Sequence, residues 1–221
     1  MTSLRLFLIC NLCSGILMMA PGSVTAQEDP EELADSSVAS IGFRAGYGWP
    51  IGDWAAHRFA PVDQFRPGFT GGGDIEFRLS HKVGLGITVD YTQLNTGDWE
   101  NYAASRGSNV SAKASVVTTG LMIRPYLRKK APSFVKMEIG LILSFASGKE
   151  RGDRNSYEYD FMKSPAFGIL IGAEYEYLLS ESVSFTIRSN FSLALSGVEY
   201  ADGTEFALTL VPLTGGFRFR L

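Results

Sequence analysis

The sequence predicts an all-β protein, an eight-stranded antiparallel transmembrane β-barrel whose strands follow one another as an up-and-down meander. From Val38 to Leu221 the chain repeats segments of about ten residues in which apolar and polar side chains alternate. Such alternation is typical of strands with one apolar and one polar face. The segments number eight, and the connections between them are alternately short and long. Short turns at one end and long loops at the other are typical of barrels that cross a membrane.

Residues 1–26 are predicted to form a signal peptide that is cleaved after Ala26. A short basic start precedes an apolar run over residues 6–19, and small residues lead up to the cleavage site. The apolar run is shorter than the roughly 20 residues that a membrane-spanning helix needs. Both cysteines, Cys10 and Cys13, lie in this leader. The mature chain is therefore expected to contain no disulfide and no thiolate metal site.

Residues 27–37 are predicted to form a flexible acidic segment. The segment reads QEDPEELADSS, and it has no apolar period. Much of the excess negative charge lies here, since the whole chain has a formal net charge of −3. No basic patch with interleaved aromatic residues occurs, so we expect no nucleic-acid partner.

Residues 38–221 are predicted to form the barrel domain. The eight predicted strands cover residues 39–48, 69–79, 83–92, 117–127, 135–145, 167–177, 183–191 and 206–221. In the eighth strand the alternation slips near Val211 and Pro212, which predicts a β-bulge. The short connections read SHK, RKKAPS and LSES. We expect these to be periplasmic turns and the four long connections to be extracellular loops.

The polar face of these strands is predicted to line the lumen. An eight-stranded barrel is just wide enough for side chains to fill it, so small residues and paired charges suit its interior. The predicted lumen charge network consists of Arg44, Asp74, Glu76, Arg78, Asp90, Arg124, Lys136, Glu138, Glu174, Glu176, Arg188, Arg218 and Arg220.

The opposite face is apolar and is predicted to contact lipid. Aromatic residues gather near the segment ends, as in the girdles at a membrane interface. They are Tyr47, Tyr91, Phe145, Tyr175, Tyr177, Phe217 and Phe219. A soluble lipocalin-like barrel, with its apolar face around a ligand, is the alternative at the level of the fold.

The chain from Val38 onward resembles the small outer-membrane β-barrel superfamily that includes the OmpA transmembrane domain and OmpX-like proteins. The stretches GYGWPIGDWAAHRF and PGFTGGGDIEFRL are similar to first-loop sequences of its porin-like members. In the last strand, Thr214, Gly216, Phe219 and Leu221 match the spacing of the C-terminal assembly signal, although the final residue is usually aromatic. The resemblance implies a bacterial outer-membrane location, contacts with membrane lipid and with the barrel assembly machinery, and a monomer.

Nothing in the sequence indicates catalysis, a cofactor or a metal site. His81 falls in a short turn, and His57 falls in the first long loop without a serine elbow or ligand spacing nearby. The RGD at residues 151–153 is expected in the third long loop as part of a charged, solvated stretch.

The predicted function is that of a non-enzymatic envelope protein with a packed polar lumen. It would have a structural or adhesive role and bind an extracellular ligand through its four loops. One alternative is a narrow porin-like channel for small solutes. Another is a lipid-modifying outer-membrane enzyme that uses His57.

Overall fold

The computed structural model describes residues 38–51, 65–96, 110–130, 132–152, 157–162, 165–196, 198–199, 205–206 and 209–221. The predicted leader, the acidic segment 27–37 and His57 lie outside these ranges. The strands are β1 (Ala39–Ile51), β2 (Phe65–Arg66), β3 (Gly68–Ser80), β4 (Val83–Thr96), β5 (Val110–Lys130), β6 (Ser133–Gly152), β7 (Tyr157–Met162), β8 (Pro165–Leu178), β9 (Val183–Ala194), β10 (Val198–Glu199), β11 (Glu205–Phe206) and β12 (Thr209–Arg220). Within the described ranges, no helix has the length and apolarity to cross a membrane.

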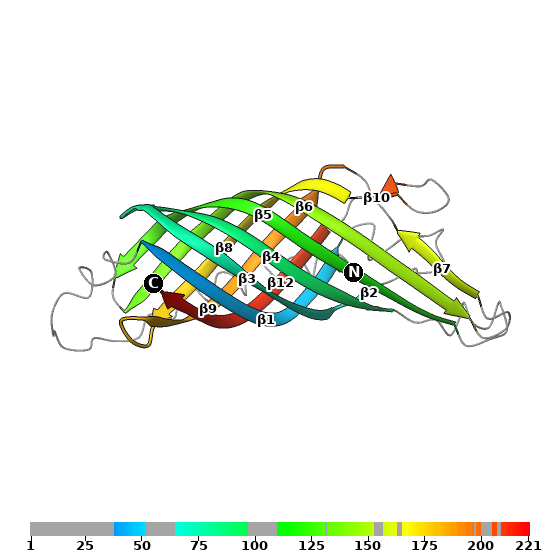
Figure 1. Ribbon diagram of the computed structural model, residues 1–221, viewed down its shortest axis with the longest axis horizontal. Helices are drawn as coiled ribbons and strands as arrows, with labels where there is room; N and C mark the ends of the chain where they lie inside the picture. Colours follow the sequence, from blue (N-terminus) through cyan, green and yellow to red (C-terminus); the bar gives the residue numbers. More distant parts are fainter. Residues whose placement is uncertain are drawn as a thin grey trace, which may run out of the picture.

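Eight of these strands close into a single antiparallel barrel, which confirms the predicted fold (Figure 1). Going around it, each of β1, β3, β4, β5, β6, β8, β9 and β12 pairs with the next. The circle closes at the seam between β1 and β12, where Ser40 pairs with Arg220 and Ile51 with Thr209. Because every long strand has two neighbours, the closed sheet satisfies its backbone groups, which a lipid environment requires.

The two ends of the barrel differ. At the turn end lie the short turns at residues 81–82 and 179–182, together with Val38 and Leu221. The backbone bond from Leu221 N to Ala39 O, 2.9 Å long, ties the C-terminal residue to the start of β1. At the opposite, loop end the strands lead into the long connections, and β5, β6 and β7 extend beyond the rest of the barrel (Figure 1).

The last strand contains no bulge at Val211 and Pro212, so that prediction is wrong. The pairing of β12 with β1 runs through both residues without a register shift, and the pairing with β9 resumes in the same register at Leu213. The strand pairing is regular, and only the type of side chain departs from the alternation. Leu210 is apolar, yet it is buried at an inward position. The register shifts of the barrel lie instead beside the short turns, between Arg78 and Ser80 and around Tyr126.

The β5–β6 hairpin is much longer than the sequence analysis predicted. β5 has 21 residues and β6 has 20, whereas a membrane-spanning strand needs only about 9–11. β6 continues through Arg151 and Gly152, which pair with both β5 and β7. The first two residues of the RGD therefore lie in a strand rather than in a loop, because neighbours on both sides complete their hydrogen bonding.

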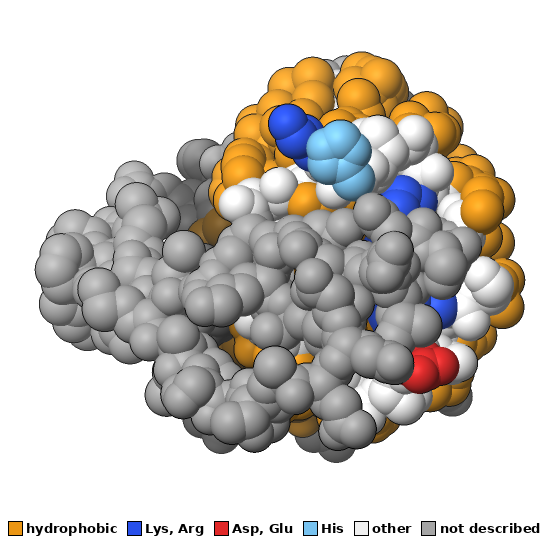
Figure 2. Space-filling view, turned by 90° about the vertical axis from the view of Figure 1, so that its left-hand side faces the viewer, with side chains coloured by type: hydrophobic (Ala, Val, Ile, Leu, Met, Phe, Trp, Pro, Cys, Tyr) orange, Lys and Arg blue, Asp and Glu red, His pale blue; other side chains and the backbone are white. Residues whose placement is uncertain are grey.

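The outer surface of the barrel is apolar. Exposed residues on it include Phe43, Tyr47, Phe69, Ile87, Val89, Tyr91, Leu121, Ile123, Ile139, Leu141, Phe145, Phe167, Ile171, Phe217 and Phe219. Viewed from the turn end, hydrophobic side chains form the upper and right-hand rim of the view (Figure 2). An apolar exterior of this extent is typical of a barrel that contacts lipid and is the reverse of the soluble alternative.

Candidate functional site: the ion-paired lumen

Glycines on the inward face make room for the charged side chains of the lumen. A Cβ atom on Gly42 would lie 2.9 Å from Asp74 Oδ1, and one on Gly84 would lie 2.6 Å from Glu76 Oε1. Both distances are too short for a carbon atom. On this face the sequence alternates glycine with long charged residues. The charged side chains of one strand therefore occupy the space beside the glycines of the neighbouring strand.

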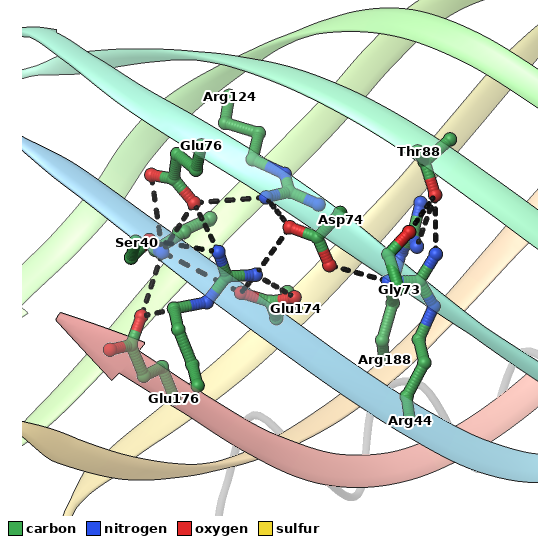
Figure 3. A network of polar contacts seen from close by, with 12 residues as sticks. Ser40, Arg44, Gly73, Asp74, Glu76, Thr88, Arg124, Glu174, Glu176 and Arg188 are labelled. Atoms are coloured by element: carbon green, nitrogen blue, oxygen red, sulfur yellow. Dashed lines mark hydrogen bonds and ion pairs between the residues drawn. The ribbon is translucent and has the colours of Figure 1, made fainter. Parts of the chain in front are cut away.

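Asp74 on β3 is an acceptor shared by three arginines (Figure 3). Its Oδ2 accepts hydrogen bonds from Arg124 Nη1 at 2.5 Å and from Arg218 Nη2 at 2.9 Å. Its Oδ1 accepts one from Arg44 Nη1. The four side chains come from four strands and are almost completely buried. One carboxylate thus pairs with three guanidinium groups, each of which also pairs with another carboxylate, in an interior where an unpaired charge is costly.

Glu138 on β6 links two arginines and extends the network across the lumen. Its Oε1 accepts a hydrogen bond from Arg124 Nε at 3.0 Å, and its Oε2 accepts one from Arg188 Nε at 2.5 Å. Arg188 on β9 also approaches β4, where its Nη1 lies 3.4 Å from Thr88 Oγ1 and 3.7 Å from Asp90 Oδ2. Because β4 and β9 belong to opposite walls of the barrel, these contacts cross the bore.

A second group of ion pairs lies toward the turn end. Lys136 Nζ donates to Glu76 Oε2 at 2.9 Å and lies 2.7 Å from Glu176 Oε2. Arg220 Nη2 donates to Glu176 Oε1 at 2.6 Å. Beside this group a small depression holds about 10 Å³, which is room for about one water molecule.

Together these contacts form an ion-pair plug. Among the described residues, the ion pairs join six cations to six carboxylates. The plug consists of Arg44, Asp74, Glu76, Asp90, Arg124, Lys136, Glu138, Glu174, Glu176, Arg188, Arg218 and Arg220. Because the charges balance and the contacts cross the bore, the plug is electrically neutral and fills this half of the lumen.

All thirteen charged residues predicted for the lumen lie at inward positions, and twelve of them make up the plug. The thirteenth, Arg78, is half-buried, and its guanidinium carbon lies 5.6 Å from the centre of the Tyr126 ring. Sequence reasoning missed the neutral members of the network. Tyr126 Oη donates to Glu76 Oε1 at 2.5 Å, and Ser184 Oγ donates to Glu176 Oε1 at 2.6 Å. Both residues stand at polar-face positions of the alternating pattern, and those positions could have identified them in the sequence.

The lumen near the loop end combines aliphatic with short polar side chains, and the sequence analysis did not anticipate the aliphatic ones. Its buried polar residues include Thr70, Thr92, Thr118 and Ser144. Small and aliphatic residues are buried at the inward positions beyond the plug, and they are Leu94, Ala114, Val116, Ile142, Ala146, Ala166, Leu170, Ala194 and Leu210. Each lies in the same alternating phase as the plug residues of its strand, on the side nearer the loop end. The sequence shows this feature as apolar residues that stand at polar-face positions of the alternating pattern.

The four residues of the predicted assembly signal occupy different environments in β12. Thr214 is buried in the lumen, whereas Phe219 and Leu221 are exposed on the outside at the turn end. Gly216 lies in the seam, directly opposite Arg44. Only Phe219 and Leu221 therefore present side chains that another protein could contact.

Exchanging Phe219 and Leu221 for aspartate should impair assembly in cells without preventing refolding in detergent. Both residues lie at the end of the barrel, where a charge on the lipid face costs only about 0–1 kcal/mol. A strong loss from the outer membrane would therefore reflect failed recognition. The measurement is heat-modifiable gel migration of membrane fractions and of refolded protein, with Leu79→Asp, an exposed residue at the same end, as the control. Equal loss for the control variant would contradict a signal in the last strand.

Of the two histidines, His81 lies within the described ranges and His57 lies outside them. His81 is exposed in the short turn after β3. No group of three or more His, Cys, Asp or Glu side chains in these ranges is placed to hold a metal ion.

Comparisons with known proteins agree with this architecture. A model of the family described as "outer membrane protein beta-barrel domain" matches residues 26–197. No curated protein matches the sequence.

Several solved structures are similar in fold. They include a major outer membrane protein from Thermus thermophilus (TM-score 0.56, 14% identity, 83% of this chain and 99% of that chain), the outer membrane protein OprG from Pseudomonas aeruginosa (TM-score 0.53, 10% identity, 85% and 98%) and Neisserial surface protein A (TM-score 0.52, 14% identity, 84% and 98%). At such identities the likeness concerns the fold, that of a small outer-membrane barrel.

Proposed function

The chain belongs to the family of outer membrane protein β-barrel domains, and we propose that in the bacterial outer membrane it is a sealed, non-enzymatic scaffold presenting an open-edged sheet to an extracellular partner. The observation that carries this proposal is the extension of β5, β6 and β7 beyond the barrel. The exposed apolar residues of β6 end at Phe145, yet the strand continues to Gly152. This part of the sheet therefore stands above the lipid-facing surface.

Both edges of the extension are open within the described residues. The pairing of β4 with β5 ends at Ala114, so residues 110–113 of β5 pair only with β6. On the other side, β7 pairs only with β6. An open edge offers a row of backbone N–H and C=O groups to an incoming strand. Binding proteins use this geometry to add an extended peptide to a sheet.

The plug supports the sealed part of the proposal and disfavours the channel. Arg188 on β9 reaches the opposite wall, where its Nη1 lies 3.4 Å from Thr88 Oγ1 on β4, and Arg218 Nη2 donates to both oxygens of Glu174 at 3.0 Å. An ion would have to break several buried ion pairs to pass. Reproducible conductance steps from the purified barrel in planar bilayers would favour the narrow channel instead.

The substitution Tyr159→Pro should weaken strand addition at the edge of β7. Proline removes an N–H and is tolerated poorly in a pairing strand, whereas Tyr159→Thr keeps the strand. The probe is a phage-displayed library of extended peptides, selected on the native barrel in nanodiscs. We expect the selected peptides to bind the proline variant about tenfold more weakly and the threonine variant as well as the native barrel. Equal binding to all three proteins would show that the edge is not the binding surface.

A further inference from the structure

We propose that the depression at the turn end of the lumen binds a single chloride ion, which completes the hydrogen bonding of the last strand. The occupant is thus a small monovalent anion. The site lies at the opposite end of the barrel from the open-edged sheet, so it does not depend on the scaffold function.

The depression lies among the side chains that end the plug. Its polar lining includes Ser40, Glu76, Lys136, Glu176, Arg218 and Arg220. Ser40, Glu76 and Glu176 lie on the same side of the network in Figure 3. The volume of about 10 Å³ admits one particle of about the size of a water molecule. A phosphate or carboxylate group is therefore too large for the depression, whereas a monatomic ion is of about the right size.

Arg218 contributes a buried donor that lacks a partner. Its side chain is 2% exposed, and its Nε has no hydrogen-bond partner among the described residues. The Nε atom lies 3.9 Å from Glu176 Oε2, which is too far for a hydrogen bond. The neighbouring Nη1 donates to Ser40 Oγ at 3.2 Å and lies 3.0 Å from Glu76 Oε2. This edge of the guanidinium group therefore borders the depression, where a ligand can accept from Nε.

The acceptors around the depression are already largely occupied. Each oxygen of Glu76 accepts at least two hydrogen bonds, and Glu176 Oε1 also accepts two. Two is about the number of lone pairs that a carboxylate oxygen offers. A water molecule bound to Arg218 Nε would need acceptors for its own two hydrogens, whereas a halide ion needs only donors. The depression thus has more to offer to an anion than to water.

Two further cations make the depression suitable for a negative charge. Lys136 Nζ lies 2.7 Å from Glu176 Oε2 and offsets the charge of that carboxylate. Arg220 Nη1 lies 3.5 Å from the carbonyl oxygen of Glu181, at the limit of a hydrogen bond, so it can turn toward an ion. An ion held by Arg218 and Arg220 beside Lys136 links the end of β12 to β6. Chloride should therefore stabilise the closed barrel.

Crystallography of the native barrel in a chloride-free bromide buffer tests the position of the ion. Bromide has the charge of chloride and nearly its size, and its anomalous scattering distinguishes it from water. We expect an anomalous peak in the depression, within hydrogen-bond distance of Arg218 Nε. Density there without an anomalous signal would assign the depression to water and overturn the proposal.

Equilibrium unfolding in urea tests the effect of the ion in solution. The native barrel in detergent is compared in sodium chloride and in sodium gluconate of equal ionic strength, so that the screening of charges is the same. Gluconate is too large for the depression. At a chloride concentration of ten times its dissociation constant, the unfolding equilibrium constant should be about elevenfold lower than in gluconate. Equal stability of the native barrel in the two salts would contradict the proposal.

Two variants separate this site from general effects of the salt. Arg218→Lys keeps the positive charge but removes the Nε donor, and we expect it to be equally stable in chloride and gluconate. Arg44→Lys is the matched control, because Arg44 Nε donates to Asp90 Oδ1 at 3.0 Å in the other part of the plug. This variant should keep the full chloride effect. An undiminished chloride effect in Arg218→Lys would overturn the proposal, and if that variant does not fold, the bromide position in the native barrel decides.

Discussion

Asp74→Asn should destabilise the barrel by about 3–5 kcal/mol, the largest loss expected from a single charge in the lumen. The substitution keeps the size of the side chain but removes the negative charge that Arg44, Arg124 and Arg218 share. The three guanidinium groups would then remain buried with too few carboxylates. The measurement is equilibrium unfolding in urea from phospholipid vesicles, followed by tryptophan fluorescence.

Asp90→Asn is the matched control for this prediction. Asp90 also pairs with two arginines, since its Oδ1 lies 2.7 Å from Arg44 Nη2 and its Oδ2 lies 3.7 Å from Arg188 Nη1. Its side chain is 14% exposed, whereas that of Asp74 is 2% exposed. Water therefore compensates part of the lost negative charge, and we expect the free energy of unfolding to fall by only about 1–2 kcal/mol. Equal losses of unfolding free energy for the two variants would mean that burial does not determine how much each carboxylate of the plug stabilises the barrel.

Gly216→Ala should prevent the barrel from closing. A Cβ atom at this position would lie 2.0 Å from the carbonyl oxygen of Phe43 and 2.8 Å from the Cα atom of Arg44. Both atoms belong to the backbone of β1, so no side-chain movement relieves the clash. We expect the seam to open and most of the refolded protein to lose its heat-modifiable gel migration.

Gly215→Ala controls for the loss of a glycine in the same strand. A Cβ atom there would lie 3.8 Å from its nearest neighbours, the ring of Phe185 and the carbonyl oxygen of Thr186, which is an ordinary contact. This variant should fold like the native protein. Refolding in detergent involves no assembly machinery, so a defect limited to Gly216→Ala is structural. If both variants fold normally, the role of Gly216 lies in recognition during assembly instead.

Much of the architecture could be predicted because the period of the side chains is local information. The alternation around Phe43 and Arg44 determines which residues share a face, and the short turns determine which strands are neighbours. The thirteen charged residues of the lumen could be listed for the same reason, because each occupies the polar phase of its strand. Strand ends were less predictable, since β5 and β6 continue through residues that have no clear alternation.

The partners within the lumen could not be predicted from the sequence. Arg188 and Asp90 are far apart in the chain and meet only because β9 and β4 form opposite walls of the closed barrel. The wrong prediction of a bulge at Val211 and Pro212 has the same cause, because the sequence does not show which residues meet inside the lumen. The pattern in that strand changes because Leu210 is buried at an inward position, and that burial depends on residues from several strands.

The sequence by itself determined the eight strands, the two unlike faces and the closing strand at the C-terminus, because alternation and turn length act over a few residues. The tertiary structure alone decided that one carboxylate serves three arginines, that the charges balance six to six among the described ion pairs, and that the β5–β6–β7 extension has open edges. Those properties depend on registers and on distances across the bore, which arise only when β1 pairs with β12.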